Sequence, residues 1–416
     1  MKKPSLFKKS VIATVVALAS QQAMAAGFQL NSQSATGLGR AFAGDAVIAD
    51  NASVMAKNAA AMALFDETAL SLGVVSIKTL IKVKDAEYTN ATGTTTSSAD
   101  YDSAGSTSYA PNLHLIVPLN EKFAVGINAY TNFGTKTEFN DSYVAGEFGG
   151  TTDIKSINFG LAGSYRIDEQ WSLGAGLDII YGQGKMQRAT ASGAKLLDID
   201  ADGWGVGFNL GTVYEMDDNN RFGLAYHYSP ELKVKGDVYR SGVTYDDDTL
   251  TLPLPDIWEL SGYHRLEDSK FAVHYSVQWI GWNTFDTLKA KDAGTIKTYE
   301  WQNGMHYSIG TTYYLNNDWT LRAGYMYDTS AQDEITSISV PDSDRNWFSA
   351  GFTYNLTAKS NIDFGFTYLL GEDVDVTESQ DFSAAYGAAA GTYVSHLNAT
   401  THADAILIGL QYSQTF

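Results

Sequence analysis

The side chains that could do chemistry in this sequence are few, and their spacing matches no catalytic or metal-binding motif. Seven histidines stand at positions 114, 227, 264, 274, 306, 396 and 402. They do not fall into the short spacings of zinc sites, and no nucleotide-binding motif is present. Asp342 and Asp344, in the stretch PDSDR, could hold a cation, but ion pairs with Arg345 explain them more simply. We therefore expect no cofactor and no metal.

The N-terminus and the composition predict a protein that is exported. Lysines at positions 2, 3, 8 and 9 precede an apolar run from Val11 to Ala19, and Ala23-Met24-Ala25 supplies a small-x-small cleavage site. This pattern predicts a secretory signal peptide over residues 1–25. The chain has no cysteine, which excludes disulfides and thiol chemistry. Its formal net charge of −19, more negative still without those four lysines, argues against nucleic acid as a partner.

The stretch from residue 158 to 181, NFGLAGSYRIDEQWSLGAGLDIIY, alternates apolar residues with mostly Gly, Ser and Ala. A period of two predicts β-strands, and the polar residues 168–170 predict a tight turn between two of them. A soluble sheet, such as a secreted β-sandwich, would carry polar residues on its second face. Here the second face is small, so the apolar face needs a covering other than a protein core.

The same alternation recurs to the end of the chain. It predicts fourteen strands, at 69–84, 113–119, 123–129, 158–167, 171–181, 204–216, 222–228, 248–266, 271–279, 307–315, 319–327, 348–356, 362–370 and 406–416. Short polar turns alternate with longer loops between them, and the even number is typical of a bacterial outer-membrane barrel. The sequence thus predicts an all-β fold, a 14-stranded antiparallel transmembrane β-barrel, with lipid on its apolar face.

Residues 26–66 precede the first expected strand and lack the alternation. They are rich in alanine, which suits short helices and turns, and they carry more apolar side chains than a solvated tail would hold. A barrel of this size encloses space that Gly and Ser side chains cannot fill. We therefore expect residues 26–66 to form a partly helical hatch, or plug, inside a barrel made by residues 67–416.

Three positions stand out on the expected inner face of the barrel. Arg188 shares its phase with Asp178 and Met186, near the outer end of a strand, where it could pair with Asp178 or with acidic residues of the loops. Gln302 and His306 share the inward phase of a later strand, and Gln302 could donate a hydrogen bond. His306 is more simply a hydrogen-bonded residue of the lumen than a catalytic group.

Another strand changes character along its length. From Phe123 to Ala129 its lipid-facing phase is apolar, and it then continues through Thr131, Phe133 and Thr135. Gly134 weakens strand pairing at this point and permits a bend or a bulge. The residues alone fit either a bend that starts an outer loop or an opening in the wall.

Seven stretches together give the sequence a specific resemblance to one family, although each is weak alone. They are GFQL at 27–30, SATGLGRAFAGDAVIADNAS at 34–53, NFGTKTEFNDSY at 132–143, GGTTD at 149–153, LPDIWELSGY at 254–263, IGTTYY at 309–314 and ISVPDSDRNWFSAG at 338–351. With these stretches the chain resembles the FadL family of outer-membrane long-chain fatty acid transporters, which includes Haemophilus-type P1 proteins and aromatic hydrocarbon channels.

The resemblance implies a 14-stranded barrel, an N-terminal hatch and apolar ligand sites inside. It implies that Phe28 contacts the ligand and that Arg188 binds the ligand's carboxylate, for which a planar guanidinium is suited. A position that is basic in the family aligns with Gln302, which we therefore take as a third ligand-binding residue. Stretches 189–200 and 237–250 are expected to be outer loops, shorter than those of the fatty acid members.

The resemblance also implies a gate in the wall. The family's NFG segment kinks inward and opens the barrel toward lipid, which assigns this role to Phe133 and Gly134. Asn58 belongs to the hatch motif, which reads Asn-Pro-Ala in the family and Asn-Ala-Ala here. Without proline the turn loses a fixed φ.

We therefore expect a channel, not an enzyme, in the outer membrane of a Gram-negative bacterium. It would take up long-chain fatty acids and similar hydrophobic compounds passively, with lateral diffusion through the kink. Its partners would be the ligand, outer-membrane lipid, lipopolysaccharide and the barrel assembly machinery, and it would be a monomer.

Three alternatives remain open. An aromatic hydrocarbon channel would share the fold. An ordinary porin would need a charged open lumen and no hatch. An outer-membrane lipase or protease barrel would need a Ser-His or Asp-His pair at the outer rim, where His396 and His402 are the candidates, with no partner motif.

Overall fold

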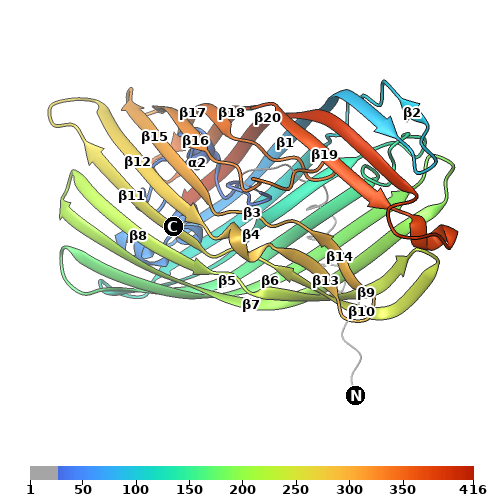
Figure 1. The fold of residues 1–416 in the computed structure, drawn as a ribbon. Coiled ribbons are helices and arrows are strands. Elements are labelled where there is room, and N and C mark those ends of the chain that lie inside the picture. Colours follow the sequence, from blue (N-terminus) through green and yellow to red (C-terminus); the bar gives the residue numbers. More distant parts are fainter. Residues whose placement is uncertain (1–26) are drawn as a thin grey trace, which may run out of the picture.

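A computed structural model describes residues 27–416, and the predicted signal peptide over residues 1–25 lies outside them. The described chain forms a closed antiparallel β-barrel of 14 strands with few helices (Figure 1). Strand β1 (Ala69–Thr89) pairs with the last strand, β20 (Val394–Thr415), from Ala69 opposite Thr415 to Thr89 opposite His396. This pairing closes the barrel and confirms the predicted fold class.

The first six strands of the barrel are single elements. They are β1, β3 (Thr107–Pro118), β4 (Phe123–Glu138), β5 (Thr151–Arg166), β6 (Trp171–Ala189) and β7 (Lys195–Asp217). A short strand, β2 (Thr95–Thr96), pairs with the outer end of β1.

The next four strands are each interrupted once. They are β8 (Asn220–Tyr228) with β9 (Glu231–Arg240), β10 (Val243–Pro253) with β11 (Ile257–Arg265), β12 (Phe271–Ile280) with β13 (Thr287–Ala290), and β14 (Gly294–Thr298) with β15 (Gly304–Tyr314). The last four are β16 (Trp319–Asp328), β17 (Arg345–Thr357), β18 (Ser360–Gly371) with β19 (Val374–Asp381), and β20.

All fourteen predicted strands are present, but most extend further at their outer ends. Stretches 189–200 and 237–250, expected to be loops, are mostly strand, because β6 and β7 are joined by residues 190–194 and β9 and β10 by residues 241–242. The loop prediction was therefore wrong. At these outer ends the inner face still carries buried apolar residues such as Ile199 and Val238, but the outer face is charged, so the lipid-facing apolar phase that marks the other strands in the sequence is lost there.

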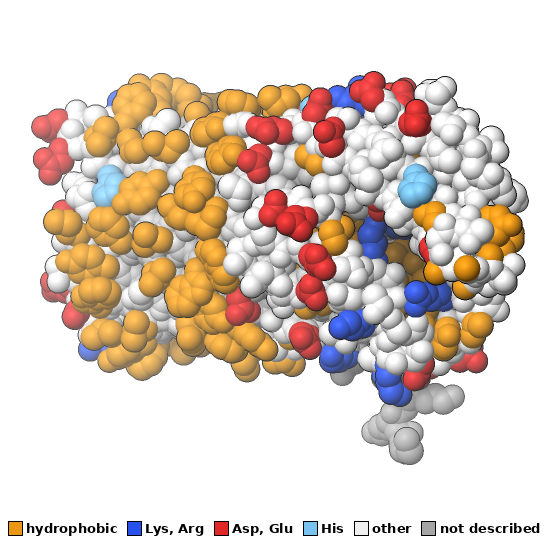
Figure 2. Space-filling model, in the orientation of Figure 1, with side chains coloured by type: hydrophobic (Ala, Val, Ile, Leu, Met, Phe, Trp, Pro, Cys, Tyr) orange, Lys and Arg blue, Asp and Glu red, His pale blue; other side chains and the backbone are white. Residues whose placement is uncertain are grey.

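The outer wall is apolar where lipid is expected. Leu161, Leu173 and Leu177 are 59%, 47% and 57% exposed, as their phase predicts. Figure 2 shows hydrophobic side chains gathered over the half of the wall nearer the short turns, whereas acidic side chains gather over the other half. Within residues 27–416 no helix is long and apolar enough to cross a membrane.

The segment before β1 lies inside the barrel and is almost entirely buried (Figure 1). It contains the short helix α2 (Ala35–Leu38) and two 3-10 helices, η1 (Ala52–Ala56) and η2 (Ala59–Leu64). Two further 3-10 helices, η3 (Trp282–Thr284) and η4 (Ser383–Tyr386), follow β12 and β19.

Glycines on the inner face of the wall make room for this segment. A Cβ on Gly174 of β6 would lie 2.1 Å from the backbone nitrogen of Ala60. A Cβ on Gly324 of β16 would lie 2.2 Å from the carbonyl oxygen of Arg40, and one on Gly365 of β18 would lie 2.3 Å from that of Ala35. The second face of the strands is small because the backbone of the N-terminal segment packs directly on it.

Candidate ligand-binding site

Phe28 sits at the centre of an aromatic cluster inside the barrel. Its ring centroid lies 4.6 Å from that of Trp282 and 5.2 Å from that of Phe285, with Trp301 at 5.6 Å and Phe133 at 6.2 Å. These rings come from the N-terminal segment, from β4, and from the connections on either side of the β13–β14 hairpin. Phe28 is fully buried, as expected for a residue of an internal apolar site.

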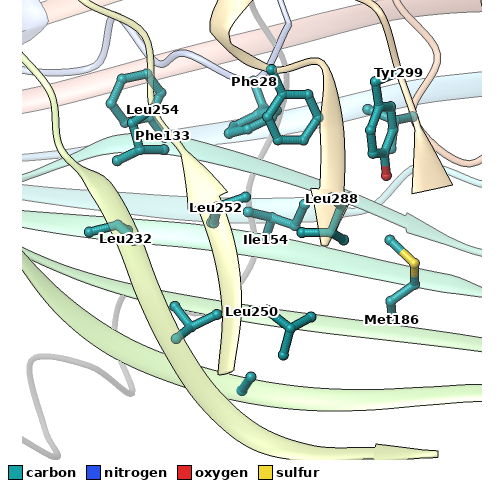
Figure 3. Close-up of a cluster of buried hydrophobic side chains, with 14 of the residues drawn as sticks. Phe28, Phe133, Ile154, Met186, Leu232, Leu250, Leu252, Leu254, Leu288 and Tyr299 are labelled. Carbon is teal, nitrogen blue, oxygen red and sulfur yellow. The ribbon is translucent and has the colours of Figure 1, made fainter. Parts of the chain in front are cut away.

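Aliphatic side chains extend the aromatic cluster toward the outer end of the barrel. They include Ile154, Met186, Ile199, Leu232, Val234, Leu250, Leu252 and Leu288. Figure 3 shows Phe133 and Met186 at opposite sides of this cluster. A cavity of about 30 Å³ remains between Ile154, Met186 and Leu250, which is room for about one water. An acyl chain would enter by moving these side chains apart.

A larger cavity of about 690 Å³, which we call the vestibule, lies at the outer end of this cluster. Met186 lines both the vestibule and the small apolar cavity, so the two spaces meet at its side chain. The vestibule is also lined by three cations, Arg188, Arg240 and Lys297.

Arg188 is buried at the inner side of the vestibule, near the outer end of β6 as predicted. Its guanidinium donates from Nη1 to the carbonyl oxygens of Thr151 (2.7 Å) and Gln187 (2.8 Å), and from Nη2 to Thr152 Oγ1 (2.8 Å). Asp178, the partner considered from the sequence, instead accepts hydrogen bonds from Asn158 and Asn209. No ion pair of the described residues includes Arg188, which suits it to an anionic ligand.

Gln302 lies elsewhere. It stands between β14 and β15 with its side chain exposed, and its Nε2 donates to the carbonyl oxygen of Ser330 at 3.4 Å. The structure therefore does not bring Gln302 to Arg188 or to the apolar cluster, to which its neighbour Trp301 belongs. His306 is buried against Asn31 (3.2 Å) and Asp328 (3.2 Å), in keeping with a hydrogen-bonded lumen residue.

The wall separates along one seam between β3 and β4. These strands pair from Pro118 opposite Ala124 up to Asn112 opposite Tyr130, and no further. Beyond that point β3 still pairs with β1, while β4 pairs with the N-terminal segment. The backbone nitrogen of Leu30 donates to the carbonyl oxygen of Asn132 (2.8 Å), and that of Gly134 to the carbonyl oxygen of Phe28 (2.7 Å).

A bulge at Asn132 directs β4 inward. In its pairing with β5, Thr131 lies opposite Ile157 and Phe133 opposite Ser156, so Asn132 is the extra residue. The bulge thus falls two residues before Gly134. It also reverses the side-chain phase, so Phe133, expected to face lipid, points inward and is only 2% exposed. A cavity of about 40 Å³ contacts Tyr130, Asn132 and Phe133 at this seam.

Asn58 joins the N-terminal segment to itself and to the wall. Its Oδ1 accepts from the backbone nitrogen of Ala60 (3.0 Å) and caps η2, while its Nδ2 donates to the carbonyl oxygens of Ala46 (2.8 Å) and of Thr212 in β7 (3.0 Å). A side-chain cap thus begins the turn at Asn-Ala-Ala, where proline is absent. A Cβ on Gly211 would lie 1.9 Å from Asn58 Oδ1, so β7 fits this side chain closely.

The segment between β4 and β5 forms a second apolar cluster at the outer end. Phe139, Tyr143 and Phe148 are buried there, and Phe148 lines the vestibule. The hydroxyl of Tyr143 donates to the carbonyl oxygen of Ala99 at 2.8 Å. Burial raises the pKa of Tyr143, so its hydroxyl remains a neutral donor.

Two functional candidates, Lys297 of β14 and Glu378 of β19, were missed by the sequence reasoning. Lys297 Nζ lies 3.0 Å from Glu378 Oε1, and both side chains line the vestibule. They are 81 positions apart in the chain. Because the pair is formed only when the barrel closes, no local motif could have revealed it.

The other charged candidates have structural partners. Arg345 pairs with Asp342, and Asp344 accepts hydrogen bonds from Tyr327 and from the backbone of Ser330, as a loop network would. Among residues 27–416 no group of three or more His, Cys, Asp or Glu side chains could hold a metal ion.

His402 is likewise engaged by neighbours. Its two ring nitrogens contact Asp373 (2.7 Å) and Asp404 (3.1 Å). Neither nitrogen is left to activate a nucleophile, as the lipase or protease alternative would require.

Comparison with known proteins gives a consistent assignment. The model of a family described as outer membrane protein transport protein (OMPP1/FadL/TodX) matches residues 16–416. A long-chain fatty acid transport protein of Escherichia coli O6:H1 is 37% identical over 432 residues, covering 92% of this chain and 96% of the relative. Outer membrane protein P1 of Haemophilus influenzae is 36% identical over 463 residues, covering 99% of each chain. These relatives are named as transport or outer-membrane proteins, not as enzymes.

Solved structures share the fold. A FadL homologue of Pseudomonas aeruginosa matches with a TM-score of 0.83 at 21% identity, covering 94% of this chain and 100% of that one. The toluene transporter TodX of Pseudomonas putida matches with a TM-score of 0.66 at 19% identity, over the same shares. With a matching family model over nearly its whole length, this chain belongs to the OMPP1/FadL/TodX family of transport proteins of the Gram-negative outer membrane.

Proposed function

We propose that this channel takes up long-chain fatty acids and similar hydrophobic compounds by passive diffusion, and releases them sideways through the seam between β3 and β4. The observation that carries the proposal is the continuous apolar cluster that begins at Met186, beside the vestibule, and ends at Phe133, beside the seam. A hydrophobic ligand would thus remain among apolar side chains from the vestibule to Phe133.

The energetics favour such a path. An acyl chain of ~16 methylenes gains about 13 kcal/mol on leaving water, at ~0.8 kcal/mol for each methylene. Release into water would forfeit this free energy, whereas release through the wall keeps the chain in an apolar medium. Movement of the ligand from the barrel into the membrane therefore needs no other energy source.

The charge of the vestibule favours a carboxylate ligand. Arg188 is buried, yet it is held by backbone carbonyls and a hydroxyl rather than by an acidic side chain. A ligand carboxylate would supply a directly paired counter-charge. The relatives from Escherichia coli O6:H1 and Salmonella typhi, at 37% and 36% identity, are named as long-chain fatty acid transport proteins.

A second candidate function is an aromatic hydrocarbon channel. The rings of Trp282, Phe285 and Trp301 surround Phe28 and would stack equally well on an aromatic ligand. Such a ligand would make no use of Arg188, which is why we place it second.

In this proposal residues 26–66 act as the hatch and residues 67–416 as the barrel. The hatch is held by contacts that can break individually, such as the bonds from Gly44 and Ala46 to Ser276 and Ser261, and by the ion pair of Arg322 with Asp50 (3.1 Å). Local rearrangement at Phe28, rather than expulsion of the hatch, would connect the apolar cluster to the seam.

We expect outer-membrane lipid and lipopolysaccharide to surround the apolar outer wall. Lys78 and Lys82 are exposed on β1 beyond Leu72 and Val74, where they would meet the phosphates of lipopolysaccharide. We further propose that the barrel assembly machinery inserts the chain and that it works as a monomer.

The test is uptake in a Gram-negative host that lacks its own fatty acid channel. Cells that produce this protein should take up labelled oleate and grow on it, whereas cells with an empty vector should not. Uptake of toluene without uptake of oleate would favour the hydrocarbon channel. Uptake of neither by a correctly folded surface barrel would contradict both.

A further inference from the structure

The cavity of about 40 Å³ at the bulge in β4, which we call the seam cavity, has a polar lining next to the apolar cluster. Phe133 and Ile180 belong both to its lining and to the apolar cluster, and Asn132 joins them at the bulge. Its volume is room for about one water or one hydroxyl group. A ligand that follows the apolar cluster to Phe133 therefore has this cavity beside it.

Glu259 orients a chain of side-chain amides that ends at the seam cavity. A carboxylate only accepts, so Gln278 turns its Nε2 to Glu259 Oε2 (3.0 Å) and its Oε1 to Gln29. Gln29 must then donate, and its Nε2 lies 3.2 Å from Gln278 Oε1 and 3.3 Å from Asn31 Oδ1. Gln29 lines the cavity and is only 2% exposed, yet its Oε1 accepts no hydrogen bond from the described part of the chain.

Asp178 orients a second set of amides in the same way. Its two oxygens accept from Asn158 Nδ2 (2.8 Å) and from Asn209 Nδ2 (2.7 Å). Asn158, which lines the cavity and is 1% exposed, is thereby left with an Oδ1 that no donor among residues 27–416 reaches.

Gln33 contributes a third acceptor to the lining. Its Nε2 donates to the carbonyl oxygen of Leu30 (3.1 Å), and its Oε1 has no partner within the described residues. The seam cavity thus has three buried amide oxygens in its lining, on Gln29, Gln33 and Asn158. Such a lining suits a group that donates hydrogen bonds.

The charges around the seam cavity disfavour an anion. Lys57 is already engaged, because its Nζ lies 2.7 Å from Asn31 Oδ1 and 3.7 Å from Glu259 Oε2. Asp178 then adds a second negative charge, so an ionised carboxylate would be repelled and left without a free cation. A carboxylic acid or an alcohol carries no charge and donates one O–H. The titratable side chains of the lining are those of Lys57, Tyr130, Asp178, His227, Tyr228 and Glu259.

We propose that the seam cavity binds the head group of the ligand as a hydrogen-bond donor, so that a fatty acid leaves the barrel as the neutral carboxylic acid. The proposal rests on the proposed transport of fatty acids and adds the form in which they are released. In the vestibule Arg188 favours the carboxylate. Between the vestibule and the seam one carboxylate oxygen takes a proton from hydronium, which leaves water, and the new O–H donates to Gln29 or Asn158. Each fatty acid thus carries one proton into the membrane.

The experiment compares ligands that share one oleyl chain and differ in head group, in cells that produce the full chain. Oleyl sulfonate stays ionised, so it should bind the purified protein beside Arg188, as measured by tryptophan fluorescence, but enter cells about tenfold more slowly than oleate. Oleyl alcohol donates a hydrogen bond and methyl oleate does not, so the alcohol should enter about fivefold faster than the ester. A more alkaline medium should slow uptake of oleate and leave uptake of oleyl alcohol unchanged.

A variant separates the charge of the sulfonate from its size. Asp178→Asn keeps the shape of the side chain, removes its charge and lets Asn158 turn its Nδ2 to the cavity, so uptake of oleyl sulfonate should rise severalfold. Asp218→Asn makes the same charge change in the exposed turn between β7 and β8 and should leave uptake of the sulfonate at the parental rate. Glu259→Gln, which frees Lys57 from its ion pair, should act like Asp178→Asn and replaces it if that barrel does not fold.

The inference is overturned if the parent takes up oleyl sulfonate as fast as oleate, or methyl oleate as fast as oleyl alcohol. It is also overturned if Asp178→Asn and Asp218→Asn take up the sulfonate equally. In each of these cases uptake of oleate by the parent would leave the transport proposal standing. If the parent takes up no oleate, the transport proposal fails and this inference fails with it.

Discussion

Gly134 of β4 donates its backbone N–H to the carbonyl oxygen of Phe28 at 2.7 Å, so the N-terminal segment occupies the edge of β4 that β3 has left. Such an edge would otherwise expose unpaired backbone groups in the wall, which is costly in a membrane. The same contact fixes Phe28 among its aromatic neighbours. The internal site and the separation in the wall are therefore parts of one arrangement.

Phe28 should be required for tight binding of the ligand. Phe28→Ala removes the ring at the centre of four aromatic contacts, and we expect oleate affinity to fall by about tenfold or more, in line with loss of a buried aromatic group. The barrel should fold normally, because Phe28 lies outside its strands. Phe123→Ala, at a 48% exposed position of the outer wall, is the control. Equal affinities of the two variants would contradict this role.

Arg188 should discriminate between carboxylates and neutral ligands. Arg188→Ala removes a charge-assisted interaction worth about 1.5–3 kcal/mol, so oleate should bind about tenfold more weakly or worse. Binding of methyl oleate should change little. Arg265→Ala, which removes a guanidinium stacked 4.0 Å from the ring of Tyr314, serves as the control. If Arg188→Ala binds oleate like the parent, the carboxylate role is wrong.

Asn58 should keep the hatch in place. Asn58→Ala loses the cap of η2 and two hydrogen bonds to backbone carbonyls, at a cost of about 1–3 kcal/mol to this segment. Gly211→Ala should act in the same direction, because its Cβ would collide with Asn58 Oδ1.

The readout for both variants is the ion conductance of single channels in a planar bilayer. Both should show more frequent openings than the parent, while heat-modifiable mobility in gels shows that the barrels are intact. Gly163→Ala, in β5, where the nearest atom to an added Cβ lies 3.9 Å away, is the matched control. Parental conductance in Asn58→Ala would argue against a hatch held at this residue.

The membrane-embedded half of the fold could be predicted from the sequence, because lipid on one side and a packed lumen on the other impose a strict alternation. The outer halves of β7, β9 and β10 could not, since exposed charged side chains such as Asp200 and Asp237 replace the apolar residues on their outer face. The inward direction of Arg188 followed from the same alternation. The position of Gln302 did not, because β15 begins only at Gly304 and its phase cannot be extended back to residue 302.

The bulge in β4 made the side-chain direction of Phe133 unpredictable from the sequence. A period of two assigns Phe133 to the lipid side, and a single extra residue at Asn132 moves it inside. The residue type of Asn132 does not mark it as a bulge. The sequence instead predicts a bend at Gly134, because glycine is the residue most associated with bends. The Lys297–Glu378 pair was beyond sequence reasoning for another reason, since it depends on tertiary contacts alone.

The central claim is that the ligand leaves through the seam, and the most direct measurement is oleate uptake by a variant that lacks Asn132. Deleting this residue removes the bulge and lets β4 continue along β3, while Asn132→Ala keeps the residue count and the bulge as a matched control. With equal amounts of surface barrel, the deletion should reduce uptake to the level of cells without the protein, and Asn132→Ala should retain the parental rate. Parental uptake by the deletion variant would contradict the lateral route and favour passage through the hatch into the periplasm.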